Sequence, residues 1–234
     1  DESNPEKLKT DVMVATLNFD TKNDSIMKLD NVKSWKPGKY LVNVETKDSF
    51  GQEVKIKTYF TLFAKEETKP PVNEINWFHV IKAKGEPGET ASFLVGTKDK
   101  NVHTLYEIVR EEKVIQSQWM ELSNEQKLIE IPITEELRGG FSVNLMFVKH
   151  NRSFNNSFNI EVPFSNKEID FEFETFRSKL IPGQKEVWKI KLKGHKGEKI
   201  AAELLASMYD ASLDALLGHS WQFSLYSQLY GQLY

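Results

Sequence analysis

The chain has 234 residues, no cysteine and a formal net charge of −3 at pH 7. At about 100–200 residues per domain, this length predicts two domains, or two and a fraction. The near-neutral charge, with positive side chains scattered among negative ones, gives no reason to expect nucleic acid as a partner. The absence of cysteine excludes a disulfide scaffold, thiol catalysis and cysteine-ligated metals. No segment approaches about 20 consecutive apolar residues, so no transmembrane segment is predicted.

The first third of the chain alternates apolar and polar residues, which is typical of half-buried β-strands. Val12–Phe19 predicts a strand. Lys39–Thr46 and Gln52–Phe63 predict two more, and the turn residues Asp48–Gly51 between them predict a β-hairpin. Pro70 and Pro71 then follow a charged stretch, and two adjacent prolines cannot enter a central strand. Residues 65–73 are therefore predicted to be an interdomain linker.

The middle of the chain is dense in short alternating segments. Hairpin turns are predicted at Arg110–Glu112 and Lys149–Arg152, and Gly139-Gly140 interrupts the chain just before a strand. Seven short strands in about 90 residues predict a sandwich of two antiparallel sheets. The predicted strands are Ile75–Lys82, Thr90–Gly96, His103–Arg110, Lys113–Glu121, Lys127–Ile133, Phe141–Lys149 and Ser153–Val162.

The last third begins at the turn residues Pro163–Asn166. Strands are predicted at Glu168–Phe176, Glu186–Leu192 and Lys199–Tyr209, and one or two helical turns at Ala211–Leu217, with Asp210 as the N-cap. Residues 221–234 are rich in Leu, Tyr and Gln but show no period. This part is shorter than the middle block, so we expect it to be the beginning of a further domain.

A Pro-Gly pair precedes an alternating strand at three places, Pro37-Gly38, Pro87-Gly88 and Pro182-Gly183. Proline presets φ near −65° and glycine accepts positive φ, so each pair predicts a tight turn. The unequal spacing of the three pairs indicates related sandwich modules rather than a solenoid. The predicted fold class is all-β, with tandem antiparallel β-sandwich domains of immunoglobulin-like type.

Motifs for catalysis are absent from the sequence. It contains no glycine-rich phosphate loop, no HExxH and no GxSxG. The five histidines lie far apart in sequence: His79, His103, His150, His195 and His219. Asp210 and Asp214 would share one face of a helix, but a cap followed by a surface carboxylate explains them better than a cation site. We therefore expect no enzyme activity, no catalytic residue, no metal site and no cofactor.

Aromatic residues are numerous, and two interpretations compete for them. An exposed row of aromatic side chains would indicate carbohydrate stacking, whereas inward-facing ones fill a sandwich core or a domain contact. Because Trp77, Trp119, Trp188 and Trp221 mostly fall within alternating strands, we expect them to pack in the core or between domains. Trp35, just before a Pro-Gly turn, is expected to cover a sandwich edge.

Four segments resemble the bacterial alpha-2-macroglobulin family, in particular the large forms of gut Bacteroidetes. Trp35–Phe60 is similar to the closing hairpin of one macroglobulin-like domain, and Lys84–Thr90 (KGEPGET) to the opening turn of the next. Ile131–Val148 is similar to the second half of a domain near the family's bait region. Phe176–Asp214 is the most specific, with its Pro-Gly-Gln start and its Ala-Glu-Leu strand running into Tyr-Asp-Ala-Ser-Leu-Asp.

The resemblance implies an interior fragment with three parts. Residues 1–66 would be the C-terminal part of one macroglobulin-like domain, 73–164 a complete domain, and 165–234 the beginning of a third. The intact protein would be a broad-range endopeptidase inhibitor in the periplasm, the outer cell envelope or the extracellular space. Its partners would be proteases and the neighbouring domains of the same chain, and this fragment would form part of the wall of the trap.

Many family members also carry a Cys-Gly-Glu-Gln-type thioester that captures the protease. This chain has no cysteine, so no thioester residue is transferred to it. No bait segment is identified either. The alternative function is a β-sandwich adhesion or glycan-binding module of a bacterial surface protein, and a third is an accessory region of an enzyme.

Overall fold

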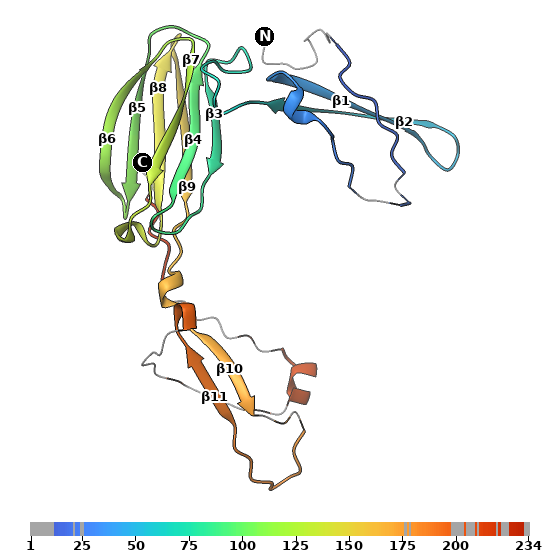
Figure 1. The fold of residues 1–234 in the computed structure, drawn as a ribbon, viewed down its shortest axis with the longest axis vertical. Helices are drawn as coiled ribbons and strands as arrows, with labels where there is room; N and C mark the ends of the chain where they lie inside the picture. Colours follow the sequence, from blue (N-terminus) through green and yellow to red (C-terminus); the bar gives the residue numbers. More distant parts are fainter. Residues whose placement is uncertain are drawn as a thin grey trace.

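A computed structural model of the chain describes residues 12–20, 22–23, 26–175, 177, 179–197, 204, 209, 211–218, 220 and 225–231. Regular structure in these residues consists of β-strands and short 3-10 helices (Figure 1). The predicted all-β fold class is therefore confirmed. None of the helices in the described residues has the length and apolar character needed to span a bilayer.

Strands β1 (Gly38–Lys47) and β2 (Glu53–Leu62) form the predicted hairpin, with Val44 opposite Ile56. Its turn depends on Asp48, whose Oδ1 accepts hydrogen bonds from the backbone N–H groups of Phe50 and Gln52, both at 2.8 Å. The 3-10 helix η2 (Val32–Ser34) precedes the hairpin. The predicted hairpin is therefore confirmed.

Two local predictions in this region are wrong. Residues 12–19 form no strand, and Val12 and Met13 are 75% and 81% exposed. An alternating segment becomes a strand only where a neighbour satisfies its backbone groups, and no described strand pairs with it. Gly38 is the second exception: it lies in β1 without positive φ, whereas Gly88 and Gly183 adopt the positive φ expected of a Pro-Gly turn.

All seven strands predicted for the middle block are present, with bounds shifted by at most two residues. A three-stranded sheet has the order β3-β4-β7 and a four-stranded sheet the order β6-β5-β8-β9. Both sheets are antiparallel, and they face each other as the two layers of a sandwich (Figure 1). The strands are β3 (Trp77–Lys82), β4 (Thr90–Thr97), β5 (Val102–Arg110), β6 (Lys113–Leu122), β7 (Glu125–Pro132), β8 (Phe141–Lys149) and β9 (Arg152–Ile160).

The core of the molecule lies between these two sheets. Phe93 of β4 is fully buried, and its ring contacts those of Tyr106 on β5 and Phe158 on β9. Burial raises the pKa of the Tyr106 phenol to about 12. Buried residues alternate with more exposed ones along most of β5, whereas the central strands β4 and β8 are buried over most of their length. Ala91, Val102, Phe141, Val143, Leu145 and Ile160 complete the centre of this cluster.

The two hairpin turns of the four-stranded sheet contain residues at positive φ. Glu111 and Glu112 between β5 and β6 have φ of 50° and 61°, and His150 and Asn151 between β8 and β9 have φ of 49° and 56°. Two-residue turns with both central residues at positive φ match the twist of the strands they join. Asparagine tolerates this conformation well, whereas glutamate adopts it rarely.

Beyond the sandwich, η3 (Glu135–Leu137) lies between β7 and β8, and η4 (Ser165–Lys167) begins the last part of the chain. There β10 (Asp170–Thr175) pairs with β11 (Lys189–Lys193), so two of the three strands predicted here are confirmed. The third, 199–209, lies almost wholly outside the described residues. The predicted helical turns appear as the 3-10 helix η6 (Ala211–Ala215), after η5 (His195–Gly197).

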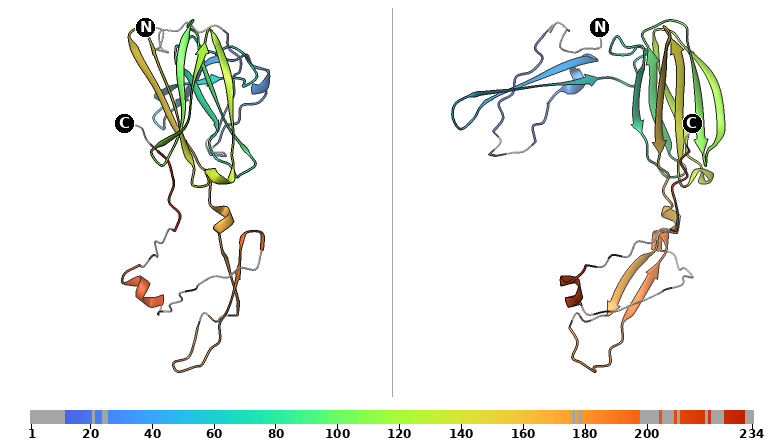
Figure 2. Two further views of the ribbon diagram at one scale, coloured as in Figure 1. Left: turned by 90° about the vertical axis from the view of Figure 1, so that its left-hand side faces the viewer. Right: turned by 180° about the vertical axis from the view of Figure 1, so that it is seen from behind.

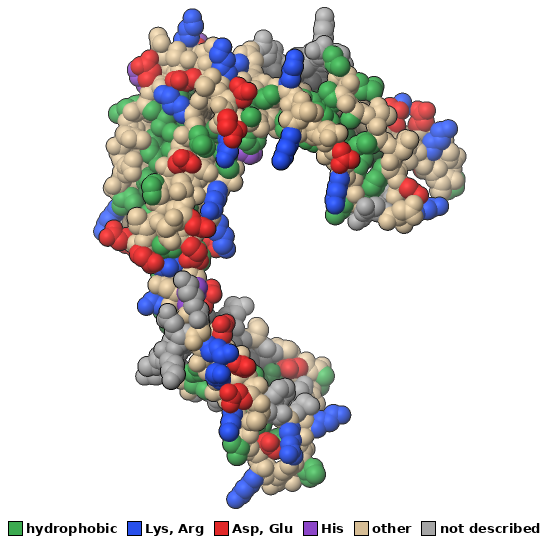
Figure 3. All heavy atoms as spheres, in the orientation of Figure 1, with side chains coloured by type: hydrophobic (Ala, Val, Ile, Leu, Met, Phe, Trp, Pro, Cys, Tyr) green, Lys and Arg blue, Asp and Glu red, His purple; other side chains and the backbone are tan. Residues whose placement is uncertain are grey.

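Charged side chains of both signs are interspersed over the face seen in Figure 3, without a large region of one sign. This agrees with the scattered charges of the sequence.

Candidate functional site

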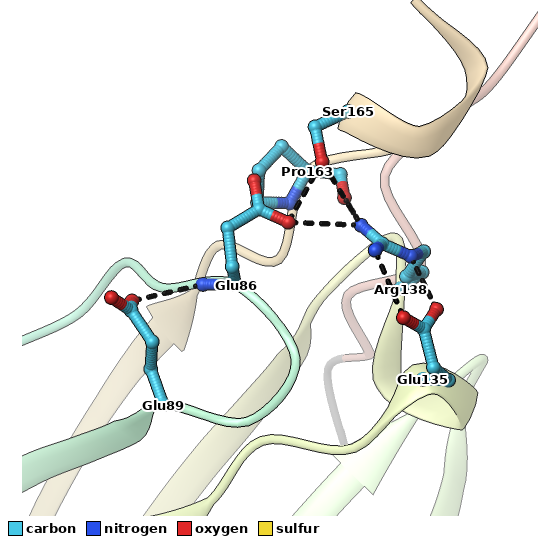
Figure 4. A network of polar contacts seen from close by, with 6 residues as sticks. All are labelled: Glu86, Glu89, Glu135, Arg138, Pro163 and Ser165. Atoms are coloured by element: carbon cyan, nitrogen blue, oxygen red, sulfur yellow. Dashed lines mark hydrogen bonds and ion pairs between the residues drawn. The ribbon is translucent and has the colours of Figure 1, made fainter. Parts of the chain in front are cut away.

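A network of polar side chains lies at the end of the sandwich, where the chain leaves it after β9 (Figure 4). Among the described residues, its central side chain makes the most hydrogen bonds. Its centre is Arg138, which follows η3 and whose side chain is 11% exposed. The guanidinium contacts Glu135 with two nitrogens, Nε to Oε2 at 2.6 Å and Nη2 to Oε1 at 3.1 Å. This fork geometry is available to arginine and not to lysine.

The remaining nitrogen of Arg138 joins two further segments. Nη1 donates to the backbone carbonyl of Pro163 at 2.6 Å, to Glu86 Oε2 at 3.1 Å and to Ser165 Oγ at 3.3 Å. Ser165 Oγ in turn donates to Glu86 Oε2 at 2.7 Å. One side chain therefore connects the β3–β4 turn, η3 and the segment leading to β10. We call these residues (Glu86, Glu135, Arg138, Pro163 and Ser165) the neck network.

Electrostatics within the neck network favour its charged forms. The hydrogen bond from Arg138 lowers the pKa of Glu135 below its ordinary 4.5, and the Glu135 carboxylate raises the pKa of Arg138. Arg110 supports the same loop by donating from Nη2 to the backbone carbonyl of Arg138 at 2.9 Å. The network is a structural joint, because Arg138 donates from all three of its side-chain nitrogens to residues of three different segments (Figure 4).

A hollow of about 710 Å³ lies between η2 and β3. Trp35, Phe63 and His79 are among its lining residues. Their rings are engaged within the protein: Trp35 stacks on Tyr40 at 5.3 Å between centroids, and Phe63 lies 4.2 Å from the His79 ring. Trp35 therefore covers an aromatic residue of β1.

The four tryptophans expected in the core or at domain contacts have different environments. Trp77 is buried, with 6% exposure, which confirms the prediction. Trp119 is 70% exposed on the edge strand β6, so core packing is wrong for it, and Trp188 is 39% exposed and only partly packed. Trp221 lies outside the described residues. Both faces of β6 carry apolar residues, such as Trp119 on one and Leu122 on the other, so alternation alone did not distinguish them.

The residues considered for metal binding are dispersed. The four described histidines lie on different elements: β3, β5, the β8–β9 turn and η5. No group of three potential ligands occurs among the described residues. Asp214 accepts a hydrogen bond from the Tyr209 hydroxyl at 2.9 Å, while Asp210 lies outside the described residues. His150 pairs instead with Asp99, whose pKa is lowered by the backbone N–H of Lys100 and by this histidine.

The sandwich and the region that follows it match a known protein family. Residues 77–216, which are more than half of the chain, match the alpha-2-macroglobulin bait region domain. The chain belongs to the alpha-2-macroglobulin family. The match begins at the first strand of the sandwich, crosses the neck network and ends just after η6. It supports a fragment of an alpha-2-macroglobulin-like protease inhibitor, and the family's domain is of non-catalytic inhibitor type. A search of curated proteins finds no match.

Sequence reasoning missed the neck network. Arg138 and Glu86 are 52 positions apart, and Arg138 and Ser165 are 27 apart. No local motif connects residues at such separations. The one available signal was the sequence Glu135–Arg138, in which a carboxylate precedes an arginine by three positions just before a Gly-Gly pair.

Proposed function

We propose that this chain is a non-catalytic wall segment of an alpha-2-macroglobulin-like protease trap. The observation that carries the proposal is the match to the bait region domain, which extends over the whole seven-stranded sandwich and beyond it to residue 216. The intact protein would inhibit endopeptidases of broad specificity. A target protease would cut an exposed segment, and the surrounding domains would then rearrange around it.

The sandwich is suited to be the part that stays fixed during such a rearrangement. Its strands are paired over their length, and its core residues, such as Phe93 and Phe141, are fully buried. Backbone in a paired ladder opens rarely and resists proteolysis, so cleavage concentrates in exposed segments. The neck network then fixes the direction in which the chain leaves the sandwich, which supports a mechanical role.

We propose that residues 73–164 are one complete macroglobulin-like domain and that 1–66 and 165–234 are parts of its neighbours. The β1–β2 hairpin supports this division: its apolar residues Val44, Val54 and Ile56 are 40–57% exposed. A two-stranded hairpin with an uncovered apolar face is at best marginally stable by itself. Neighbouring domains of the parent chain would cover this face.

A secreted or cell-envelope location, in the periplasm, at the outer envelope or outside the cell, is part of the same proposal. So is a bacterial source of the Bacteroidetes type. The bacterial source is supported by the resemblance of Trp35–Phe60 and Phe176–Asp214 to the Bacteroidetes forms. The location is supported by the proposed function, because a trap must meet proteases where they act.

The proposal is tested by the substrate-size dependence of inhibition. The full-length parent protein is incubated with a panel of endopeptidases, and residual activity is measured with a large protein substrate and with a small chromogenic peptide. An enclosing trap reduces hydrolysis of the large substrate at least tenfold and leaves the small one mostly unaffected. Equal inhibition of both substrates, or inhibition of neither, contradicts the proposal.

The glycan-binding alternative is favoured by one observation, the exposed Trp119. It lies opposite Leu105 of β5 on the outer face of the four-stranded sheet. If this face binds carbohydrate, Trp119→Ala abolishes binding to a soluble polysaccharide panel while Phe50→Ala, another exposed aromatic change, does not. Under the trap proposal neither the parent chain nor the variants bind glycans.

A further inference from the structure

After leaving the sandwich at Pro163, the chain returns to it. Residues 225–231, called here the strap, lie against the same end of the sandwich (Figure 2). The Leu229 N–H donates to the Gly139 carbonyl at 2.8 Å, and the Leu229 carbonyl accepts from the Glu111 N–H at 3.0 Å. Tyr230 and Arg110 form an isolated antiparallel bridge. The strap is therefore added to the end of β5 by strand-like pairing.

The shape of the contact depends on glycines from both sides. A Cβ on Gly140 would lie 2.5 Å from Tyr230 Cε1, as well as 2.5 Å from the Ile160 carbonyl oxygen. A Cβ on Gly139 would lie 2.8 Å from Leu229 Cγ. These distances are too short for real Cβ contacts, so the Gly-Gly pair before β8 lets the strap approach closely.

The strap contributes a matching glycine of its own. Gly231 is buried, and a Cβ there would meet Val109 Cγ1 at 2.6 Å and the Glu112 nitrogen at 2.8 Å. Its N–H donates to Ser142 Oγ at 3.3 Å. The surface that receives the strap, called here the seat, thus consists of the 110–112 turn, Gly139-Gly140 and Ser142.

The backbone conformation of the seat supports a specific contact with the strap. Glu111 and Glu112 both adopt positive φ, which side chains of this type rarely do, and the Glu111 N–H is one of the groups that hydrogen-bond the strap. At the start of the strap, the ring of Tyr226 stacks on that of Phe164, with centroids 4.9 Å apart. The segment between them is thereby closed into a loop at its base.

We infer that the seat is a binding surface for an extended peptide segment and that the strap of this chain is its occupant. The contacts of the strap hold it on the sandwich independently of its covalent connection through the chain. A single cut in the stretch after β11 therefore leaves the two fragments associated. In the proposed trap, the strap would keep a cleaved segment attached to the wall. Only this consequence rests on the proposed function.

An engineered cut tests the inference. A recognition sequence for a site-specific protease is inserted in the full chain between Leu216 and Leu217, which are 84% and 83% exposed. After cleavage at micromolar concentration, size-exclusion chromatography with mass spectrometry shows whether the C-terminal fragment co-elutes with the rest. We expect co-elution in the parent chain. In Gly231→Ala the retained fragment falls at least tenfold, because the added methyl group does not fit the seat.

Gly218→Ala is the matched control, since a Cβ there meets nothing within 4 Å, and it retains the fragment. In uncut chains, hydrogen exchange of the Glu111 and Leu229 amides is at least tenfold faster in Gly231→Ala than in Gly218→Ala, with unchanged circular dichroism. Loss of the fragment from the parent chain, or its equal retention in both variants, overturns the inference. Because the cut uses no target protease, neither result depends on the inhibitor proposal.

Discussion

Trp77 Nε1 donates a hydrogen bond to Gln126 Oε1 at 2.8 Å, on the face of the three-stranded sheet opposite the core. The amide nitrogen of Gln126 then donates to two backbone carbonyls of the preceding segment, Ala64 at 3.0 Å and Glu67 at 2.8 Å. The backbone N–H of Gln126 donates to the Thr68 carbonyl at 2.8 Å. The segment predicted to be a linker is thus fastened to β7 by one residue.

Replacing Gln126 should both loosen the linker and destabilise the sandwich. Gln126→Ala removes three side-chain hydrogen bonds and leaves the Trp77 N–H buried without its acceptor, which costs about 2–4 kcal/mol of the free energy of unfolding. Urea unfolding measures this loss, and limited proteolysis at residues 64–70 should accelerate. Gln118→Ala, at an exposed position of β6, serves as control and should change stability by less than about 0.5 kcal/mol. Equal stability of both variants would refute the role of Gln126.

The core should respond to truncation far more than the hairpin turn does. Phe93→Ala opens a cavity at a fully buried position and should lower the free energy of unfolding by about 3–5 kcal/mol. Phe50→Ala makes the same change in the β1–β2 turn, where Phe50 is 89% exposed, and should be nearly neutral. Denaturant titration of the two variants compares them directly. A small effect of Phe93→Ala would show that the two sheets do not share this core.

Acid should weaken the neck network. Because the folded-state pKa of Glu135 is lowered below 4.5 by Arg138, its stabilising contribution is complete above about pH 4.5 and is lost as the pH falls through the folded pKa. Glu135→Gln should therefore reduce the decrease in Tm between pH 7 and pH 3. Part of the decrease remains, because Glu89 and Glu172 also have lowered pKa values.

Glu136→Gln provides the control for this titration, since Glu136 is the exposed neighbour of Glu135 and is not one of the residues of the neck network. Its pH profile should match that of the parent chain. If Glu135→Gln and Glu136→Gln give the same profile, the ion pair with Arg138 contributes no measurable stability.

The strands were predictable where a period-two pattern coincided with a partner, as in Gly38–Lys47 with Glu53–Leu62. Where a partner was missing, as for Val12–Phe19, the same pattern misled, because alternation shows amphipathicity and not pairing. Trp119 shows a second limit: on an edge strand with apolar residues on both faces, the sequence does not decide which face is inward.

The strap and the neck network were not predictable from local sequence. Residues 225–231 carry no period, and their contacts with Gly139 and Glu111 span about ninety positions or more. Gly139-Gly140 was recognised only as a break before a strand. The pair also leaves room for Leu229 and Tyr230, and this depends on a tertiary contact that no pattern along the chain predicts.

The most direct test of the wall proposal is to cleave the full-length parent protein with the protease panel, map the cuts by mass spectrometry and record small-angle X-ray scattering before and after. The proposal predicts one preferred cut outside the paired strands of 77–160, followed by compaction with the protease retained. Cuts scattered over several linkers, with no change in shape and no retained protease, would contradict it.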